Sequence, residues 1–201
     1  MSRRKVSNPL ALAALACLYE RPMHPYEIAS TLRERHKDDS IKLNYGSLYS
    51  VVEALKNHAL ITEQETERHG NRPERTVYQI TDAGRLELID WLSELLCRPV
   101  KEFTRFEAGL SLVPVLPPKD VIALLEERCR RLLVEIEQYG SLRKLMSSQQ
   151  IPRLFLIESE YRFALREAEL NWTRALIADI ASGSLEGMER WVKLHEAAAK
   201  G

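Results

Sequence analysis

Apolar residues recur at helical spacing from the start of the chain. We expect a helix over residues 9–20, because Asn8 and Pro9 suit an N-cap and a first helical position and an apolar run comes directly after them. Pro22 then interrupts the pattern. A second helix is expected from about Pro25, and it would turn three apolar residues inward, namely Ile28, Ala29 and Leu32. Two short amphipathic helices in succession indicate a small helical core near the N-terminus.

The next stretch, residues 44–61, combines a buried stripe with a polar outer face. Four apolar residues fall on one stripe at helical spacing: Leu48, Val51, Val52 and Leu55. The opposite face, with Gly46, Ser50, Glu53 and Asn57, is small and polar in its first turns, and Ser47 and Tyr49 flank it. Short side chains let a helix approach the bases of a DNA major groove closely. An ordinary amphipathic helix has the same pattern, so a recognition helix is predicted only in combination with the residues after position 61.

A hairpin is predicted after this helix. Residues 61–67 read as a polar strand, residues 68–75 as a turn rich in Gly, Asn, Pro and Arg, and residues 76–80 as a β-prone strand. Thr81 suits the N-cap of a further helix over residues 82–97. Helix, strand, basic loop, strand and helix is the winged-helix order, in which the loop lies along DNA phosphates.

Two packing expectations accompany this arrangement. Ile41 and Leu43 are placed to pair briefly with the strands of the hairpin. The helix over residues 82–97 is expected to keep Trp91 at the edge of its apolar stripe. The residues expected to be buried on that stripe are Leu88, Ile89, Leu92, Leu95 and Leu96.

Three motifs in this region resemble the PadR family of bacterial transcriptional regulators: HPYEIASTL, NYGSLYSVVEALKNHALI and RTVYQITDAGR. They are correctly ordered and spaced, and together they span about residues 10–95. The chain departs mildly from the family pattern, with Pro25 in place of Gly, Ser47 in place of Thr and Ile80 in place of Leu. The resemblance implies a mainly α-helical winged helix-turn-helix protein with a two-stranded wing. It also implies a homodimeric repressor that binds a palindromic operator in double-stranded DNA.

Five residues of the predicted recognition helix are expected to contact DNA. Ser47 and Ser50 would face bases because of helical geometry, and Tyr49 would face a phosphate because it occupies a motif position of the resembled family. Lys56 would also face a phosphate. Tyr45 lies at the mouth of the helix, where a phosphate would be, although a core-edge aromatic residue is an equal alternative.

The predicted wing supplies the other DNA contacts. Arg72 and Arg75 lie in its loop, where they would bind phosphates. Glu53 on the recognition helix is awkward beside phosphates. It would either accept a hydrogen bond from a cytosine amine or pair with Lys56 or Asn57 on its own helix, and we favour the pairing.

Pro99 marks a domain boundary. We expect a DNA-binding domain over residues 1–97 and a helical domain for dimerisation and effector binding over residues 98–201. A short helix is expected near residues 103–110 and a last helix beyond Gly183, on either side of two long helices.

The two long helices, residues 119–148 and about 153–181, carry apolar residues spaced alternately by three and four. The first seam comprises Ile122, Leu125, Cys129, Leu132, Ile136 and Tyr139, and the second comprises Tyr161, Leu165, Ala168, Trp172 and Ala175. One helical hairpin does not use this much apolar surface, so we expect a homodimer through these helices. Packing within one monomer is the alternative.

Composition excludes several classes of protein. Lys and Arg total 29, as do Asp and Glu, so the net charge of zero excludes a chain that is basic throughout. It also keeps open an alternative, a winged-helix module that binds protein rather than DNA. No zinc-binding cysteine pair, phosphate loop or catalytic motif occurs, so we expect no enzyme, cofactor or metal. No apolar run is long enough for a membrane span, and a cytoplasmic location is expected.

A small aromatic effector is the last expectation. Some regulators of the resembled family respond to such compounds, and planar apolar ligands suit aromatic walls. The aromatic residues expected to border a site between the domains are Trp91, Phe103, Phe106, Phe163 and Trp172. Each of them taken singly is more typical of a core position.

Overall fold

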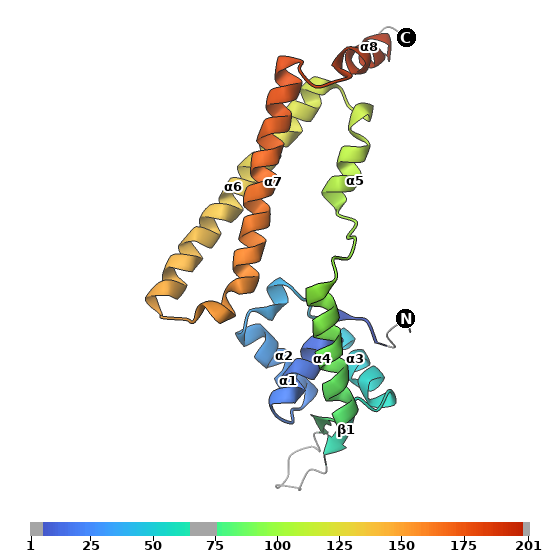
Figure 1. Cartoon of the computed structure of the whole chain (residues 1–201), viewed down its shortest axis with the longest axis vertical. Coiled ribbons are helices and arrows are strands. Elements are labelled where there is room, and N and C mark those ends of the chain that lie inside the picture. The colour runs from blue at the N-terminus through green and yellow to red at the C-terminus, as the bar shows by residue number, and fades with distance from the viewer. Residues whose placement is uncertain (1–5, 65–75, 199–201) are drawn as a thin grey trace. The chain divides into compact units, whose positions relative to one another are not determined.

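The computed structural model describes residues 6–64 and 76–198, and it is mainly α-helical with one two-stranded antiparallel sheet (Figure 1). The chain divides into two compact units, Met1–Lys101 and Glu102–Gly201. The division falls a few residues beyond the boundary expected at residue 97. Each unit has its own hydrophobic core and is described by itself below.

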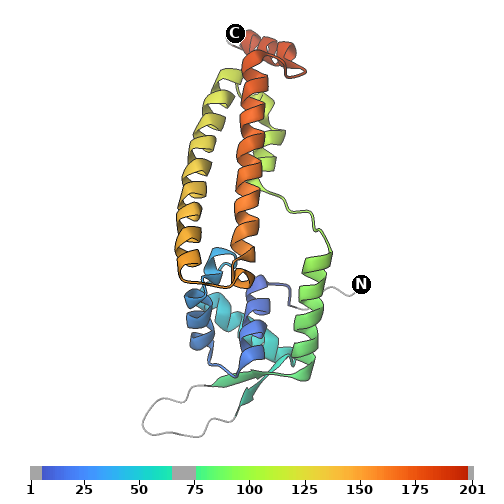
Figure 2. The same cartoon turned by 60° about the vertical axis from the view of Figure 1, so that its left-hand side comes forward.

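The first unit has the predicted winged-helix order. Its elements are α1 (Pro9–Glu20), α2 (Pro25–Glu34), the 3-10 turn η1 (Lys37–Asp39), α3 (Tyr45–Asn57), β1 (Ile61–Gln64), β2 (Val77–Ile80) and α4 (Asp82–Cys97). The side chain of Asn8 accepts a hydrogen bond from the Leu10 amide at 2.9 Å, so the predicted N-cap of α1 is confirmed. α1 and α4 lie side by side in the core of this unit (Figure 2).

The residue that pairs with the two-stranded sheet from outside it is not one of those expected. β1 and β2 pair antiparallel, with Ile61 opposite Ile80. Ile41 and Leu43 do not pair with these strands; they pack half-buried against the core instead. Met23 takes the position beside β2, and its N–H and C=O exchange 3.0 Å hydrogen bonds with Tyr78. Met23 lies between α1 and α2. A single extended residue leaves no alternating pattern in the sequence, so this pairing could not be predicted.

The expected buried face of α4 is partly wrong. Leu88 is buried as predicted, and Trp91 lies in the core rather than at its edge. Four of the five residues expected in the core, Ile89, Leu92, Leu95 and Leu96, are exposed within this chain. α4 is apolar on more than one side, and only the side with Gly84, Leu88 and Trp91 packs in the core of its unit. Periodicity reveals apolar faces but does not reveal which face meets which partner.

The second unit is a long helical hairpin with helices at one end. Its elements are α5 (Arg105–Ser111), η2 (Val113–Val115), α6 (Pro118–Ser148), η3 (Arg153–Phe155), α7 (Ile157–Ser182) and α8 (Met188–Ala198). α6 and α7 run beside each other (Figures 1 and 2). Gly183 ends α7 in the left-handed region, with φ at 74°, which only glycine adopts without steric cost.

The apolar seam of α6 is used inside this unit. Leu125, Cys129 and Leu132 are buried, and the last two pack in a cluster with Leu170 of α7. Arg128 forms an ion pair with Glu169 across the same two helices. The α6 part of the predicted dimer surface is therefore already covered within one chain, whereas the residues of the α7 stripe remain exposed.

Candidate nucleic-acid interface

α3 is positioned so that one polar face is left uncovered. The Asn44 side chain accepts a 2.9 Å hydrogen bond from the Gly46 amide and caps the helix. The stripe predicted to be buried is buried in full, namely Leu48, Val51, Val52 and Leu55. The hydrophobic effect therefore fixes the rotation of the helix about its axis, and the opposite face is turned to solvent.

Three of the residues expected to contact DNA lie together on that face. Ser47, Tyr49 and Ser50 are all exposed, and Tyr49 is 49% exposed. The Ser50 hydroxyl donates to the Gly46 carbonyl at 3.1 Å, so its own lone pairs stay available as acceptors. This surface offers hydroxyl groups on short side chains, beside one large phenol.

Tyr45 belongs to a cluster that the sequence did not reveal. The Arg33 guanidinium lies 4.3 Å from the centroid of the Tyr45 ring and donates a hydrogen bond to its hydroxyl. Tyr26 is a further aromatic partner, with the Tyr26 and Tyr45 centroids 6.1 Å apart and their planes at 12°. These residues come from α2 and the start of α3, and no local spacing links them. The charged end of α2 was the one available signal.

Lys56 has a charged partner that the sequence did not reveal. Its Nζ lies 2.5 Å from the Oε1 of Glu63 on β1, and this hydrogen bond raises the pKa of Lys56 above its ordinary value. Glu53 does not form the pairing that we favoured. Within the described part of the chain, no hydrogen bond or ion pair joins it to Lys56 or Asn57. The reason is that β1 brings a better-placed carboxylate to the same lysine.

Arg72 and Arg75, the predicted wing contacts, lie outside the described residues. The strands on either side of them are paired through Gln64 and Val77. The predicted hairpin is therefore present at its base.

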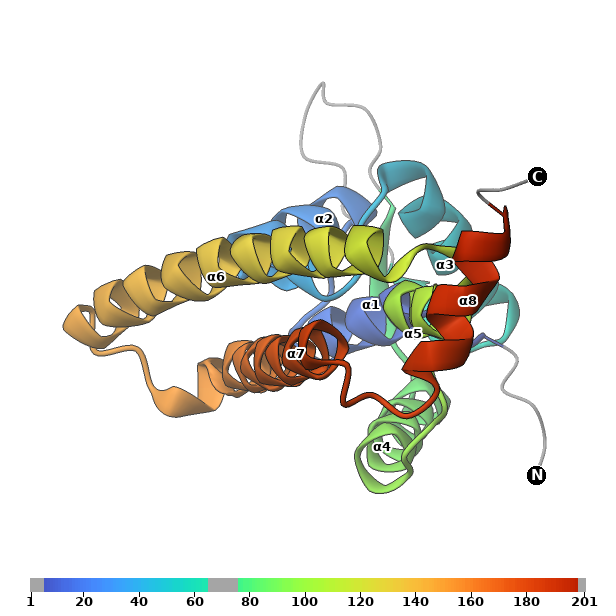
Figure 3. The ribbon, with the colours of Figure 1, turned by 90° about the horizontal axis from the view of Figure 1, so that it is seen from above.

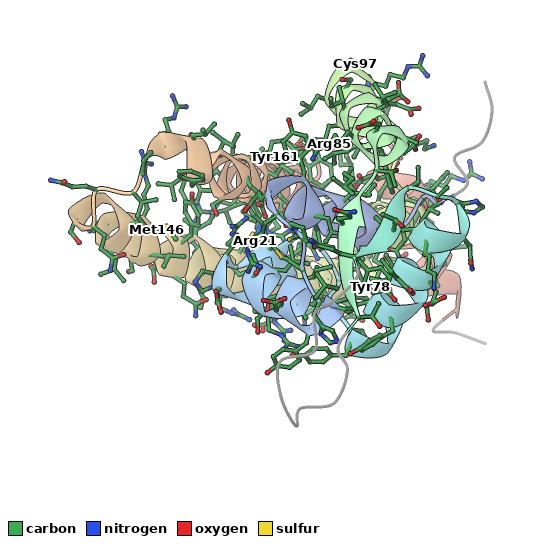
Figure 4. The ribbon with its side chains drawn as sticks, turned by 90° about the horizontal axis from the view of Figure 1, so that it is seen from below. Arg21, Tyr78, Arg85, Cys97, Met146 and Tyr161 are labelled. Carbon is green, nitrogen blue, oxygen red and sulfur yellow. The ribbon has the colours of Figure 1, made fainter. Side chains whose placement is uncertain are left out.

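The base of this hairpin is anchored by the motif around Thr81. The Thr81 hydroxyl donates to the Ala59 carbonyl at 2.8 Å and accepts from the Gly84 amide at 3.0 Å, which confirms the predicted cap of α4. A Cβ at Gly84 would lie 2.0 Å from the Leu60 carbonyl oxygen, so the close approach of α4 requires glycine here. Figure 4 shows Arg85 on α4 and Tyr78 on the strand beside it.

The motif at the start of α2 is also structural. The backbone N–H of His24 donates to the Glu27 carboxylate at 2.8 Å, and the His24 Nδ1 accepts from the Tyr26 amide at 3.1 Å. This is a capping box with histidine at the N-cap. Pro25 at the first helical position fits it, because proline needs no amide hydrogen there.

The aromatic residues expected at an effector site are distributed over both units. Trp91 is buried in the first unit, and Phe103 is 85% exposed in the stretch before α5. Phe106 and Trp172 form an edge-to-face pair at 6.2 Å. Phe163 stacks instead on Tyr139 and lies about 13 Å from Trp172 along α7. Within the second unit, one pair is therefore brought together and Phe163 is apart from it.

The described residues offer neither a metal site nor a membrane span. They contain no group of three or more His, Cys, Asp or Glu placed to hold a metal ion. None of their helices combines the length and the apolar character needed to cross a membrane.

Comparison with known proteins agrees with this geometry. Residues 14–90 match the model of the "Transcriptional regulator PadR-like family". The fold is similar to Bacillus subtilis PadR in complex with operator DNA (TM-score 0.63, 22% identity, 87% of this chain and 99% of that chain). It is also similar to that protein in complex with p-coumaric acid (TM-score 0.65, 21% identity, 86% and 98%). The Vibrio cholerae virulence activator AphA gives a TM-score of 0.63 at 19% identity, over 86% and 98%.

The structural matches show a shared fold, and the family match confirms the resemblance carried by the three motifs. The comparison with curated proteins found no match.

Proposed function

We propose, from the premise that residues 14–90 belong to the PadR-like family of transcriptional regulators, that this protein regulates transcription by binding operator DNA. Members of this family are regulators and not enzymes. The observation that carries the proposal is the exposed polar face of α3 on a winged-helix scaffold. Solved relatives of the same fold include one bound to operator DNA.

The mechanism rests on the size of that face. A major groove about 12 Å wide admits an α-helix most closely where its side chains are short. Ser47 and Ser50 would then reach base edges, while the longer Tyr49 would reach a phosphate beside the groove. The Arg33–Tyr45 contact holds a hydroxyl and a cation at the start of α3, where a second phosphate would lie.

Selection of binding sites from a random double-stranded DNA library tests this function without a known operator. The DNA upstream of the protein's own gene is a second probe. Tyr49→Phe removes only a phenol hydroxyl and should weaken binding by about tenfold for all sequences, as expected for a hydrogen bond to a charged group. Tyr19→Phe is the matched control, because Tyr19 is also 49% exposed but lies on α1. Equal affinity of the two variants would move the contact surface away from α3.

The predicted wing contacts stay part of the proposal. Arg72→Ala and Arg75→Ala should each lower the slope of log affinity against log salt by about 0.9, because each removes one phosphate contact. The fold should persist, since the hairpin is anchored at its base by Thr81 and Gly84. Unchanged salt slopes in both variants would exclude this wing from the DNA interface.

A homodimer would present two such helices to a palindromic operator. The exposed α7 stripe supports it, because Tyr161 (labelled in Figure 4) and Leu165 are exposed in the single chain, by 68% and 50%. Tyr161→Asp with Leu165→Asp should give a monomer in sedimentation. Val134→Asp is the control, since Val134 on α6 is 52% exposed. Loss of the dimer in the control alone would place the interface on α6.

Repression released by a small aromatic effector is the finer part of the proposal. Its support is the solved complex of Bacillus subtilis PadR with p-coumaric acid and the Phe106–Trp172 pair in this chain. A coupling of about 1–3 kcal/mol would loosen operator binding by about 5–150-fold. A reporter gene behind a selected operator distinguishes a repressor from an activator, and added aromatic compounds then test the release.

A winged-helix module that binds protein is the second candidate. Lys56, Glu63 and Glu53 together carry one net negative charge beside the exposed face of α3, which favours this candidate over a strongly basic DNA surface. The DNA selection separates the two: a library that yields no enriched sequence at low salt would favour protein binding.

A further inference from the structure

The second unit contains an open groove between α8 and the elements that it covers, which we call the α8 groove. Its volume is about 960 Å³, and its walls come from α5, η2, α7 and α8. The main apolar lining residues are Leu110, Val113, Trp172, Leu176, Trp191 and Leu194. Figure 3 shows α8 lying close to α5 in the view from above. A groove of this size is within the range of small-molecule sites, about 300–1,000 Å³.

The walls of the α8 groove are held in place by two long-range hydrogen bonds. The indole N–H of Trp191 donates to the Leu116 carbonyl at 2.8 Å, and Nε2 of His195 lies 3.0 Å from the Pro114 carbonyl oxygen. A carbonyl only accepts, so this ring nitrogen carries a hydrogen and donates it. Trp191 itself is buried, at 8% exposure. Trp191 and His195 lie one helical turn apart, so α8 is attached at two points to the segment with Pro114 and Leu116. These two hydrogen bonds hold the walls of the α8 groove in place without a ligand.

Part of the apolar lining of the α8 groove is exposed to solvent. In the single chain Trp172 is 50% exposed and Leu194 is 58% exposed, and they line the groove from α7 and α8. The Trp172 ring packs against Phe106 with the two ring planes nearly perpendicular. Each exposed apolar surface costs about 25 cal/mol per Å² relative to burial, so an apolar ligand that covers both side chains would bind favourably.

The charged residues on the α8 side of the groove indicate which polar group a ligand would carry. Arg190 and Lys193 line the groove and are exposed, and no ion pair joins either to another described residue. Glu186 is the acidic residue of the lining, so the three together carry one net positive charge. A guanidinium beside an apolar wall suits a carboxylate, which it binds with two parallel hydrogen bonds.

We propose that the α8 groove binds a small apolar carboxylate, with its aromatic or aliphatic body on Trp172 and Leu194 and its carboxylate on Arg190 and Lys193. This site differs from the effector site expected between the domains, with which it shares Trp172 alone. The binding itself is independent of the regulatory role. Only the step from occupancy to operator affinity rests on the proposed function.

Isothermal titration of the full chain tests the proposal with two probes, 2-naphthoate and decanoate. The variant Arg190→Gln with Lys193→Gln should bind both at least about tenfold more weakly, because charge-assisted hydrogen bonds are lost. Arg174→Gln with Lys144→Gln is the matched control, since it removes the same charge from exposed positions of α7 and α6 outside the lining. Its affinity should equal that of the wild type.

A neutral analogue, 2-naphthalenemethanol, should bind at least about tenfold more weakly than 2-naphthoate to the wild type. Binding of one carboxylate probe but not the other supports the site and narrows the class to aromatic or to aliphatic acids. Three results would overturn the proposal: no saturable binding of either acid, equal loss in both double variants, or equal affinity for the neutral analogue.

DNA-binding measurements on the same proteins, with and without the acids, distinguish ligand binding in this groove from a regulatory effect of that binding. Charge-dependent acid binding by a protein that binds no DNA, or whose DNA affinity the acids leave unchanged, supports the α8 groove and refutes only the regulatory step. Dimer dissociation caused by the Arg190 and Lys193 changes, without acid binding, would instead assign the groove to a second copy of the chain and overturn the proposal.

Discussion

Replacement of Gly84 by alanine would test how the winged-helix unit is held together. Gly84 lies in the first turn of α4, and its ideal Cβ would meet the Leu60 carbonyl oxygen at 2.0 Å and the Ile80 Cγ1 at 2.8 Å. Ordinary van der Waals contacts of a Cβ begin at 3.4 Å. The nearer obstacle is backbone, which cannot rotate aside as a flexible side chain can. α4 must therefore move away from the hairpin base.

The size of the effect depends on the contacts that this movement disrupts. Overpacking in a well-packed core costs about 1–3 kcal/mol. The Thr81 hydroxyl bond to the Ala59 carbonyl would be stretched or lost, for about a further 1 kcal/mol. Alanine favours a helix over glycine by about 1 kcal/mol, which offsets part of the cost. We expect a net destabilisation of about 1–3 kcal/mol, confined to the first unit.

Hydrogen–deuterium exchange of the full chain is the suitable assay, because it reports each unit separately. Amides of α4 and β2 that exchange through opening of this unit should exchange about 5–140-fold faster in Gly84→Ala, at tenfold per 1.4 kcal/mol. Peptides from α6 and α7 provide an internal reference and should be unchanged.

Gly46→Ala is the matched control for this prediction. The Cβ at position 46 would meet only the Asn44 Oδ1, at an ordinary 3.5 Å. Alanine there should be neutral or stabilising, by up to about 1 kcal/mol, because of its helix propensity. The steric reasoning is refuted if both alanine variants exchange at the same rate as the wild type in α4.

Three further predictions concern single side chains. Burial raises the pKa of Cys17 to about 11, so iodoacetamide at pH 8 should modify the exposed Cys97 and leave Cys17 unmodified until the chain unfolds, as peptide mass spectrometry would show. The hydrogen bond from Arg35 lowers the pKa of Glu20 below its ordinary 4.5. The small contribution of this pair to stability should be full above pH 4.5 and should fall as the pH drops through the lowered pKa. Arg35→Gln should remove this part of the acid dependence in thermal unfolding. His195→Phe deletes one attachment of α8 and should speed exchange of the α8 amides while those of α7 stay unchanged.

Helix ends were predictable because their signals are local. Asn8 and Thr81 each accept a hydrogen bond from an amide two or three residues further on, so the cap and its partner are close in the sequence. The resulting helices begin where expected. The same holds for the buried stripe of α3, which needs only helical periodicity and one apolar face.

Contacts between distant segments were not predictable, since no spacing encodes them. The Arg33–Tyr45 cluster joins two helices through a charged residue and an aromatic residue, neither of which has a periodic pattern. Met23 entered the sheet as one residue, and Glu63 reached Lys56 from the neighbouring strand. α4 shows the same limit for apolar faces: its sequence offers more than one, and burial in the folded unit selects Leu88 and Trp91.

These differences bear on where DNA affinity would originate. α3 carries one cation, Lys56, and one acid, Glu53, and the cation is already paired with Glu63. Arg33 is engaged by the hydroxyl and ring of Tyr45. In the proposed complex α3 would therefore add shape and hydroxyl groups but little net charge, and the salt-dependent part of binding would have to come from other positions. Because each phosphate contact contributes about 0.9 to the salt slope, the slope of the full chain reports mainly on residues outside α3.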